Sequence, residues 1–240
     1  MSKIIVTGSE GYIGSKLAKY LEELGHEVCR IDWVLGTTVS NTFFRDVDFI
    51  YHLAAQTDVQ YSRNNPHFDA INNIGTTIEV IKKYPNVPVI YAASAASLEY
   101  RSPYGLSKKV CEEYIKMLCP KYVLCRIPNP WGDGGHGAVD YFFKSETIKV
   151  NGEGLQSRTI IHVQDIVKAF IKAMEWETGE YNLGGGEEFN LTVKEISERV
   201  AKKTGKDVVF NLSYDPIKEG EVFAAILPNT TPNWQPEIIL

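Results

Sequence analysis

The first half of the chain alternates short apolar runs with segments whose apolar residues recur every three or four positions. The apolar, β-branched runs predict strands in KIIVTG, HEVCRID, DFIYHLAA, VPVIYAAS and KYVLCRI. Helical spacing predicts helices in GYIGSKLAKYLEELG, FDAINNIGTTIEVIKKY and YGLSKKVCEEYIKML. Such alternation is typical of a parallel sheet with right-handed crossovers and helices on both faces. We therefore predict an α/β fold with a doubly wound parallel sheet.

One predicted helix carries a regular apolar stripe. Ile71, Ile74, Ile78 and Ile81 recur at helical spacing in FDAINNIGTTIEVIKKY. We expect these four side chains to share one face of the helix.

The pattern changes near Asn129. PNPWGDGGHGAVDYF reads as a long Gly- and Pro-rich loop, and helices are predicted in HVQDIVKAFIKAMEW and TVKEISERVAKKTG, with a short strand in GEYNLGGGEEFN between them. We predict a first domain over residues 1–128 and a smaller lobe over 129–240, with segments near 158–185 returning to the first domain.

The formal charge argues against some classes of partner. The 240 residues carry a net charge of -5 and no basic run, which favours neither nucleic acid nor a membrane surface. Small anions stay possible because backbone N–H groups bind phosphate without side-chain charge. The N-terminus lacks the apolar region of a signal peptide, and no apolar run is long enough to span a bilayer, so we expect a cytoplasmic protein.

The four cysteines show no metal-binding spacing. Cys29, Cys111, Cys119 and Cys125 form no C-x-x-C pair and have no histidine cluster beside them. We expect free thiols in a reducing compartment, rather than a metal site or a disulfide framework.

A glycine-rich turn stands between the first strand and the first helix. In VTGSEGYIG, Gly8 permits a tight turn, Gly11 lets a pyrophosphate approach the backbone, and Gly14 allows close helix packing. The free N–H groups of the helix N-terminus then face a phosphate. This context predicts dinucleotide binding; the alternative is a similar turn that binds nothing.

Asp32 ends the second predicted strand. A carboxylate at this place accepts the ribose hydroxyls of adenosine and repels a 2′-phosphate. Trp33 and Val34 follow, without the Arg or Lys that would receive that phosphate. The sequence therefore favours NAD over NADP; the alternative is a solvated Asp at a strand end that binds no cofactor.

Tyr104 and Lys108 lie four residues apart at the start of a predicted helix, with Pro103 before them. A phenol has an ordinary pKa of about 10, and a nearby ammonium and an oxidised nicotinamide ring both favour its ionised form. Tyr104 so tuned can take a proton from a sugar hydroxyl. Neither Tyr91 nor Tyr100 has a lysine at the same spacing. Taken alone, such a pair is often a surface contact on a helix.

Ser94 ends the strand in VPVIYAAS, and carboxyl ends of parallel strands are where ligands bind in this architecture. Its hydroxyl can bridge a substrate oxygen and the phenol of Tyr104. Ser97 lies further into the loop, and we expect Ser107 on another face of the helix.

Together these motifs resemble the extended short-chain dehydrogenase/reductases, and among them the NAD-dependent epimerase/dehydratase family of nucleotide-sugar enzymes. The likeness covers nearly the whole chain. TGSEGYIG is similar to T-G-x-x-G-x-x-G, HLAA to the family's H-L-A-A strand end, NNIGTT to N-x-x-G-T, SPYGLSKK to P-Y-x-x-S-K, CRIPNPWG to L-R-x-x-N-x-Y-G, and NGEGLQSRTIIHVQD to G-x-G-x-x-x-R-x-x-x-x-V-x-D. The resemblance implies a Rossmann-type sheet with a small C-terminal substrate-binding lobe, NAD as cofactor, a nucleotide-diphosphate sugar as substrate, and a homodimer.

The resemblance also implies site residues. It makes Ser94, Tyr104 and Lys108 the catalytic trio, and Ser94, Asn129 and Arg158 contacts of the substrate. It places NAD against a larger set: Gly8, Gly11, Tyr12, Ile13, Gly14, Asp32, Leu53, Ala54, Ala55, Asn72, Tyr104 and Lys108.

The residues after Ser94 separate the reactions of the family. Its 4,6-dehydratases carry an acidic residue shortly after the catalytic serine or threonine, whereas this chain has Ala95 and Ala96. The chain is thus similar to the 4-epimerases, in which Tyr104 would take the O4 proton and a transient 4-keto sugar would turn over. The alternatives are an NAD(P)-dependent nucleotide-sugar reductase or dehydratase, or a catalytically silent dinucleotide-binding sensor.

The chain departs from the family pattern in several places. Only fifteen residues separate Asp32 from Asp48, so the usual third strand and its helix look cut down. The G-D-[IV] adenine contact is missing, and Lys218 stands where an Arg often grips the diphosphate.

Overall fold

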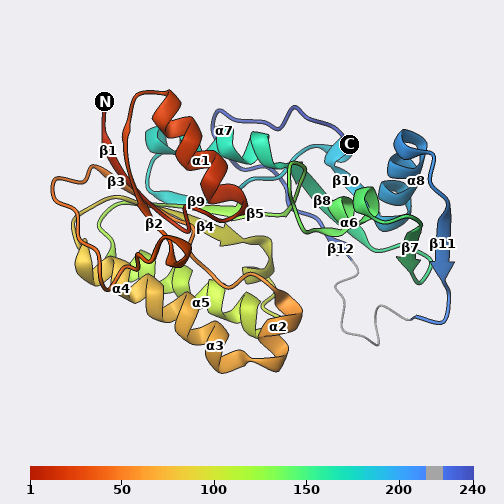
Figure 1. Cartoon of the computed structure of the whole chain (residues 1–240), viewed down its shortest axis with the longest axis horizontal. Coiled ribbons are helices and arrows are strands. Elements are labelled where there is room, and N and C mark those ends of the chain that lie inside the picture. The colour runs from red at the N-terminus through yellow and green to blue at the C-terminus, as the bar shows by residue number, and fades with distance from the viewer. Residues whose placement is uncertain (215–223) are drawn as a thin grey trace. The chain divides into compact units, whose positions relative to one another are not determined.

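The structure is a computed structural model that describes residues 1–214 and 224–240 (Figure 1). Lys218 lies outside the described residues. The chain divides into two compact units, one of residues 1–126 and 167–181 and the other of residues 127–166 and 182–240.

The N-terminal unit is built on a six-stranded sheet in the order β2-β1-β3-β4-β5-β9. Its strands are β1 (Lys3–Thr7), β2 (Glu27–Ile31), β3 (Phe49–His52), β4 (Val89–Ser94), β5 (Tyr122–Ile127) and β9 (Gly179–Asn182). β1 pairs in parallel with β2 and β3, and β3 pairs in parallel with β4. The predicted α/β fold with a parallel, Rossmann-type sheet is confirmed.

Helices cover both faces of this sheet (Figure 1). α1 (Tyr12–Glu23) lies on one face and ends before Gly25, whose φ of 83° suits glycine. The other face carries α3 (Pro66–Ala70), α4 (Thr76–Lys83) and α5 (Pro103–Leu118), and the short α2 (Val59–Asn64) precedes α3. The sheet is buried between these layers, as the apolar runs of its strands require.

The predicted helix over FDAINNIGTTIEVIKKY contains a π-helical turn, Ile71–Gly75, between α3 and α4. A π turn adds a residue to the helix and rotates the following face. Ile71 is therefore 55% exposed, while Asn73 and Thr77 point into the unit at 1% each. The expected stripe of four isoleucines was wrong at Ile71.

The connection between β2 and β3 is short. It holds one 3-10 turn, Trp33–Leu35, and no strand among residues 32–48, all of which the structure describes. β2 consequently lies at the edge of the sheet. The sequence analysis expected the family's third strand and its helix to be shortened between Asp32 and Asp48, and this prediction is confirmed.

The C-terminal unit has its own small sheet, in which β8 (Ser157–His162) pairs with β6 (Asn129–Trp131), β10 (Asn190–Thr192) and β12 (Ala224–Ala225). β7 (Ile148–Asn151) pairs in parallel with β11 (Val208–Asn211). The helices are α6 (Ala138–Lys144), α7 (Val163–Lys172), which continues into the N-terminal unit, and α8 (Val193–Thr204). Thr192 and Glu195 begin α8 with a reciprocal capping box.

The expectation of an unbroken loop over PNPWGDGGHGAVDYF was wrong, because it holds β6 and α6. β6 has only three residues, too few to show a pattern of its own, and its pairing with β8 defines it. The apolar core of this unit packs α6 and α8 against the strands through Phe142, Ile148, Ile160 and Val200.

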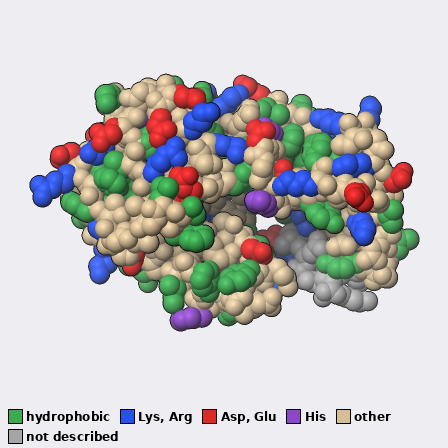
Figure 2. Space-filling view, viewed as in Figure 1, with side chains coloured by type: hydrophobic (Ala, Val, Ile, Leu, Met, Phe, Trp, Pro, Cys, Tyr) green, Lys and Arg blue, Asp and Glu red, His purple; other side chains and the backbone are tan. Residues whose placement is uncertain are grey.

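Charged side chains of both signs are spread over the face seen in Figure 2. Within the described residues, every helix is too short or too polar to cross a bilayer. The four cysteines are buried free thiols, and burial raises the pKa of Cys29, Cys119 and Cys125.

Candidate active site

The glycine turn lies between the carboxyl ends of β2 and β3. Gly8 has φ of 70°, a conformation that favours glycine, and its N–H donates to the carbonyl of Ile31 at 2.9 Å. A Cβ atom on Gly8 would lie 2.8 Å from the backbone nitrogen of Ala54. The close approach of these two backbones therefore requires glycine.

Gly14 fixes how α1 leaves the turn. A Cβ atom on Gly14 would lie 2.0 Å from the carbonyl oxygen of Gly8, so the helix can pack here only without a side chain. Gly11 is the N-cap of α1 and supplies no side-chain cap. The first N–H groups of α1 are thus left for backbone, solvent or an anion.

His52 joins the turn to the end of β3. Thr7 Oγ1 accepts from the N–H groups of Leu53 and Ala54 at 3.2 Å each, and so its own proton goes to His52 Nδ1 at 2.8 Å. His52 Nε2 lies 3.0 Å from Thr77 Oγ1 and is the donor there, because that hydroxyl donates to the carbonyl of Asn73. Burial, helped by the charge of Lys108, lowers the pKa of His52 to about 3. The imidazole of His52 is neutral and has a structural role. It orients the hydroxyl of Thr7, which holds Leu53 and Ala54 beside Gly8.

Asp32 follows β2 and is 7% exposed. Its carboxylate accepts from the N–H groups of Glu10 and Val34 at 3.0 Å each, which links the glycine turn to the 3-10 turn of Trp33–Leu35. Each carboxylate oxygen keeps a free lone pair, so a ribose hydroxyl can still donate to it.

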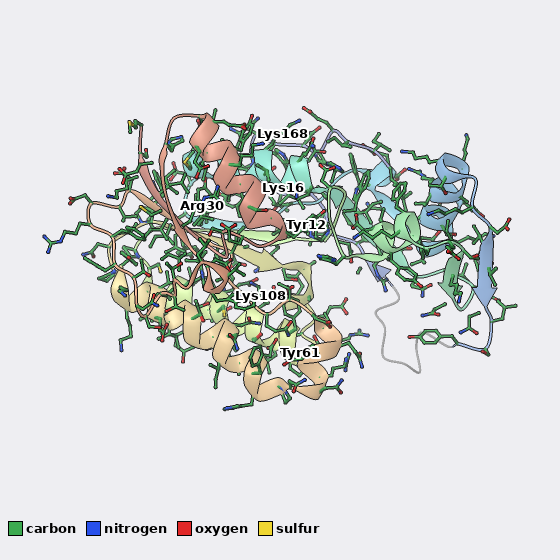
Figure 3. The ribbon with its side chains drawn as sticks, viewed as in Figure 1. Tyr12, Lys16, Arg30, Tyr61, Lys108 and Lys168 are labelled. Carbon is green, nitrogen blue, oxygen red and sulfur yellow. The ribbon has the colours of Figure 1, made fainter. Side chains whose placement is uncertain are left out.

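Tyr12 and Ile13 open α1 and are half-buried. The ammonium of Lys16 lies 5.0 Å from the ring centroid of Tyr12, and both side chains are labelled on α1 in Figure 3. Leu53, Ala54 and Ala55 are half-buried where the chain leaves β3.

Tyr104 lies at the second position of α5. Ser102 caps this helix through the N–H of Gly105, Pro103 occupies the first turn, and the N–H of Tyr104 donates to the buried hydroxyl of Ser62 at 3.2 Å. Ser94, the last residue of β4, lowers the pKa of the phenol through a side-chain hydrogen bond, so two of the three predicted catalytic residues lie within hydrogen-bonding reach of each other.

The pKa of the Tyr104 phenol lies above its ordinary value. Burial raises the pKa most, the hydrogen bond with Ser94 lowers it, and Asp69 and Cys111 raise it further. For Tyr104 to act as a base, an additional positive charge at the site must favour the phenolate.

Lys108, labelled in Figure 3, belongs to the N-terminal unit. It lies one turn after Tyr104 on α5 and is 2% exposed. Its ammonium lies 4.2 Å from the ring centroid of Tyr91 on β4, a cation–π contact. Burial lowers its pKa to about 8, against the opposing effects of Cys111, Glu112 and Asp69. Ser94, Tyr104 and Lys108 all lie in the N-terminal unit at the junction of β4 and α5.

A buried ion pair supports the turn that follows Ser94. Arg126 on β5 binds Glu112 on α5 through Nε at 3.1 Å and Nη2 at 2.7 Å, and also pairs with Glu180 on β9. Ser97 Oγ lies 2.5 Å from Glu112 Oε1 and 2.7 Å from the carbonyl oxygen of Ser94, and these two acceptors share its single proton. The turn of Ala95–Ser97 is thereby tied to α5 and to the sheet.

A second buried network was not foreseen from the sequence. Asn73 donates to Asp69 at 3.2 Å and to Ser107 at 2.9 Å, and accepts from the N–H of Gln56 at 2.8 Å. Ser107, which we expected on another face of the helix than Lys108, is 3% exposed and takes part in this network. Only the tertiary structure reveals these partners, because the π turn decides which residues point inward.

Asn72 lies outside the polar network of Asn73. Its side chain is half-buried and donates to the carbonyl of Phe68 in its own helix at 2.8 Å. The structure thus brings Asn73, rather than Asn72, into the polar network beside α5, and a contact of Asn72 with the cofactor stays a prediction.

Asn129 and Arg158 lie on neighbouring strands of the C-terminal unit. Asn129 on β6 is paired with Ile160 on β8, two residues from Arg158. Asn129 Nδ2 donates to the carbonyl of Thr159 at 2.9 Å, and Arg158 Nη1 donates to the carbonyl of Ser157 at 2.9 Å.

The NAD dependent epimerase/dehydratase family matches residues 4–184, which include the glycine turn, Ser94, Tyr104 and Lys108. The chain belongs to this family. The cofactor of this epimerase/dehydratase family is NAD.

The relatives include epimerases and reductases. A putative UDP-glucose 4-epimerase of Methanocaldococcus jannaschii is 29% identical over 291 aligned positions, covering 99% of this chain and 94% of the relative. A UDP-2-acetamido-2,6-beta-L-arabino-hexul-4-ose reductase of Pseudomonas aeruginosa is 27% identical, covering 82% of this chain and 56% of that protein. The alignment with the Methanocaldococcus relative is longer than the 240 residues of this chain. The relative therefore has segments that are absent from the given sequence.

A solved structure has the same fold over nearly its whole length. UDP-glucose 4-epimerase of Thermotoga maritima, crystallised with UDP-glucose, is 25% identical with a TM-score of 0.84, covering 98% of this chain and 94% of that one.

The residues of this epimerase/dehydratase protein fit NAD. Gly8 and Gly14 pack against the protein's own backbone without a side chain, which holds the start of α1 close to the ends of β1 and β3. α1 begins without a side-chain cap, and Asp32 offers lone pairs after the end of β2. A helix N-terminus for the pyrophosphate and a carboxylate for the ribose are parts that a dinucleotide requires.

Proposed function

We propose that this protein is an NAD-dependent nucleotide-sugar epimerase that inverts C4 of its substrate through a transient 4-keto sugar. The observation that carries the proposal is the contact of Tyr104 with Ser94, one helical turn from buried Lys108, in a site whose next residues are Ala95 and Ala96. Glu99, the nearest carboxylate along the loop, is exposed and paired with Arg101 at 3.0 Å. A residue able to protonate a leaving hydroxyl, as dehydration requires, is absent from the turn Ala95–Ser97.

NAD, when bound, accepts a hydride from a sugar carbon and can return it. In the proposed mechanism, Tyr104 takes the proton of the O4 hydroxyl as base and gives it back as acid. Ser94 orients the oxygen through its hydroxyl, and the ammonium of Lys108 favours the phenolate of Tyr104. Asn129 and Arg158 are proposed to contact the nucleotide diphosphate, because their side chains offer an amide and a guanidinium for phosphate oxygens.

A panel of nucleotide sugars tests the proposal. The purified protein is incubated with UDP-, dTDP- and GDP-sugars without added cofactor, and the C4 stereoisomer is followed by NMR. An epimerase converts substrate with no net use of NADH. Stoichiometric consumption of NADH on 4-keto sugars instead supports the second candidate, a reductase, which the Pseudomonas relative favours. Failure of both reactions, with no NAD copurifying, leaves the sensor alternative.

The proposed preference for NAD depends on Asp32. Asp32→Ala is expected to weaken NAD binding about tenfold or more and NADP binding less, since a carboxylate hydrogen bond to the ribose is lost only with NAD. Calorimetric titrations with both cofactors measure the ratio. Distortion of the turn that Asp32 caps would weaken both cofactors alike, so an unchanged ratio contradicts the role. Glu27→Gln, an exposed change on β2, the strand that precedes Asp32, is the control.

The proposal includes a cytoplasmic homodimer. The buried free thiols fit a reducing compartment. α3 and α5 carry exposed apolar side chains, among them Phe68 at 48%, Leu106 at 51% and Met117 at 76%. Such side chains favour helix pairing between two copies. Light scattering that gives the mass of a monomer at micromolar concentration contradicts the dimer.

A further inference from the structure

Asp69 on α3 is a buried carboxylate beside the catalytic helix. It is 1% exposed, and its Oδ1 accepts from Gln56 Nε2 at 3.0 Å and from Asn73 Nδ2 at 3.2 Å. Asn73 also binds Ser107, the neighbour of Lys108 on α5. Asp69 is thus joined through one amide to the helix turn that carries Tyr104 and Lys108.

Among the described residues, no cation pairs with the carboxylate of Asp69. Its Oδ2 has no hydrogen-bond partner, and Asp69 makes no ion pair within the residues that the structure describes. Glu112 differs, because Arg126 binds both of its oxygens. Burying an ionised carboxylate without a cation partner costs several kcal/mol, and a positive charge elsewhere in the same buried region offsets part of that cost.

Lys108 is the buried cation on which the negative charge of Asp69 acts. Tyr91 faces its ammonium from β4, neutral His52 lies toward it from β3, and Tyr104, Cys111 and Glu112 share its helix. Burial lowers the pKa of Lys108, while Cys111, Glu112 and Asp69 act in the opposite direction. Glu112 and Asp69 are the two carboxylates that raise the pKa of Lys108, and since Arg126 already balances Glu112, Asp69 is the one without a cation partner among the described residues.

We propose that Asp69 is a positioning residue of the site, whose buried carboxylate keeps the ammonium of Lys108 ionised at neutral pH without touching it. The inference rests on the proposed function, because it concerns the same Tyr104–Lys108 pair. Asp69 acts across α3 and α5 through space, and Asn73 and Gln56 hold it there.

Asp69→Asn tests the inference with little structural change. The amide oxygen can still accept from Gln56 and Asn73, and the new NH₂ group takes the place of the unpartnered oxygen. The full chain, labelled with [ε-¹³C]lysine and free of NAD and substrate, is titrated by NMR, and Lys108→Met assigns the resonance. We expect the pKa of Lys108 to fall by about half a unit or more, because a charge that acts through space without contact shifts a pKa less than one at close range.

Two further variants and a pH–rate profile extend the test. Asp69→Ser repeats the comparison with a smaller side chain, and Glu79→Gln, an exposed change on α4, is expected to leave Lys108 unaffected. If the enzyme is active, the alkaline limb of its pH–rate profile moves to lower pH in Asp69→Asn. An unchanged Lys108 pKa in both Asp69 variants, or a wild-type Lys108 that is neutral at pH 7, overturns the inference. A shifted Lys108 in a protein inactive on every nucleotide sugar supports it and refutes the proposed function.

Discussion

Tyr104→Phe is expected to reduce turnover of the nucleotide sugar roughly a hundred- to ten-thousand-fold, the range of a lost acid/base group. The phenylalanine ring keeps the packing of the site, and only the oxygen bonded to Ser94 is removed. NAD binding should change little, because the proposed pyrophosphate and ribose contacts lie at the glycine turn and Asp32. Steady-state rates and a calorimetric titration of NAD measure the two effects separately.

Tyr114→Phe is the matched control. Tyr114 lies on the same helix but is 36% exposed, and its loss of a hydroxyl should leave turnover within about twofold, since an exposed hydroxyl takes part in no chemistry. Near-full activity of Tyr104→Phe rejects Tyr104 as the acid/base. Equal loss of activity and of NAD binding indicates that the substitution has disturbed the cofactor site instead.

The difficulty that Tyr104 must overcome is electrostatic. Burial and the charge of Asp69 both raise the pKa of its phenol. The oxidised nicotinamide ring supplies a positive charge that favours the phenolate, and the ammonium of Lys108 supplies another. Asp69 therefore acts on the two residues in opposite senses: it disfavours the phenolate directly and favours it indirectly by keeping Lys108 charged.

Local patterns were sufficient to predict the sheet and the positions of the main site motifs. Each strand is predicted from its own apolar run, and the glycine turn is predicted from residues within one loop. Both signals therefore lie within a short stretch of sequence. Tyr104 and Lys108 likewise lie one helical turn apart on α5. The contact of Tyr104 with Ser94 is one step harder, because it needs β4 and α5 to meet, yet the order of elements implies it.

Features fixed by distant partners could not be predicted. The π turn of Ile71–Gly75 has no signal in a pattern that assumes an unbroken α-helix, and it determines that Asn73 and Thr77 point inward. The short strands β6 and β12 are defined by their pairing with β8 rather than by their own residues. Arg126 finds Glu180 across 54 residues of sequence. A short stretch of sequence contains no signal that would pair two residues so far apart in the chain.

The buried pair of Glu112 and Arg126 is expected to give the largest effect on stability. Glu112 is fully buried and Arg126 is 7% exposed, so removing the carboxylate leaves a guanidinium with only Glu180 to balance it. Breaking a buried pair commonly costs 3–5 kcal/mol, and we expect Glu112→Leu to lower the free energy of unfolding by about 3 kcal/mol, the low end, because Glu180 remains. Urea denaturation followed by circular dichroism measures the change.

Two comparisons separate the charge from the packing. Glu113→Gln alters the next residue of α5, whose carboxylate is half exposed and pairs with Lys109 and Lys116, and it should cost less than about 1 kcal/mol. Glu112→Leu combined with Arg126→Met removes both charges and should be more stable than Glu112→Leu alone, because no uncompensated guanidinium stays buried. If the double variant is instead less stable, Arg126 stabilises the protein through its remaining pair with Glu180, and it is not an uncompensated charge once Glu112 is removed.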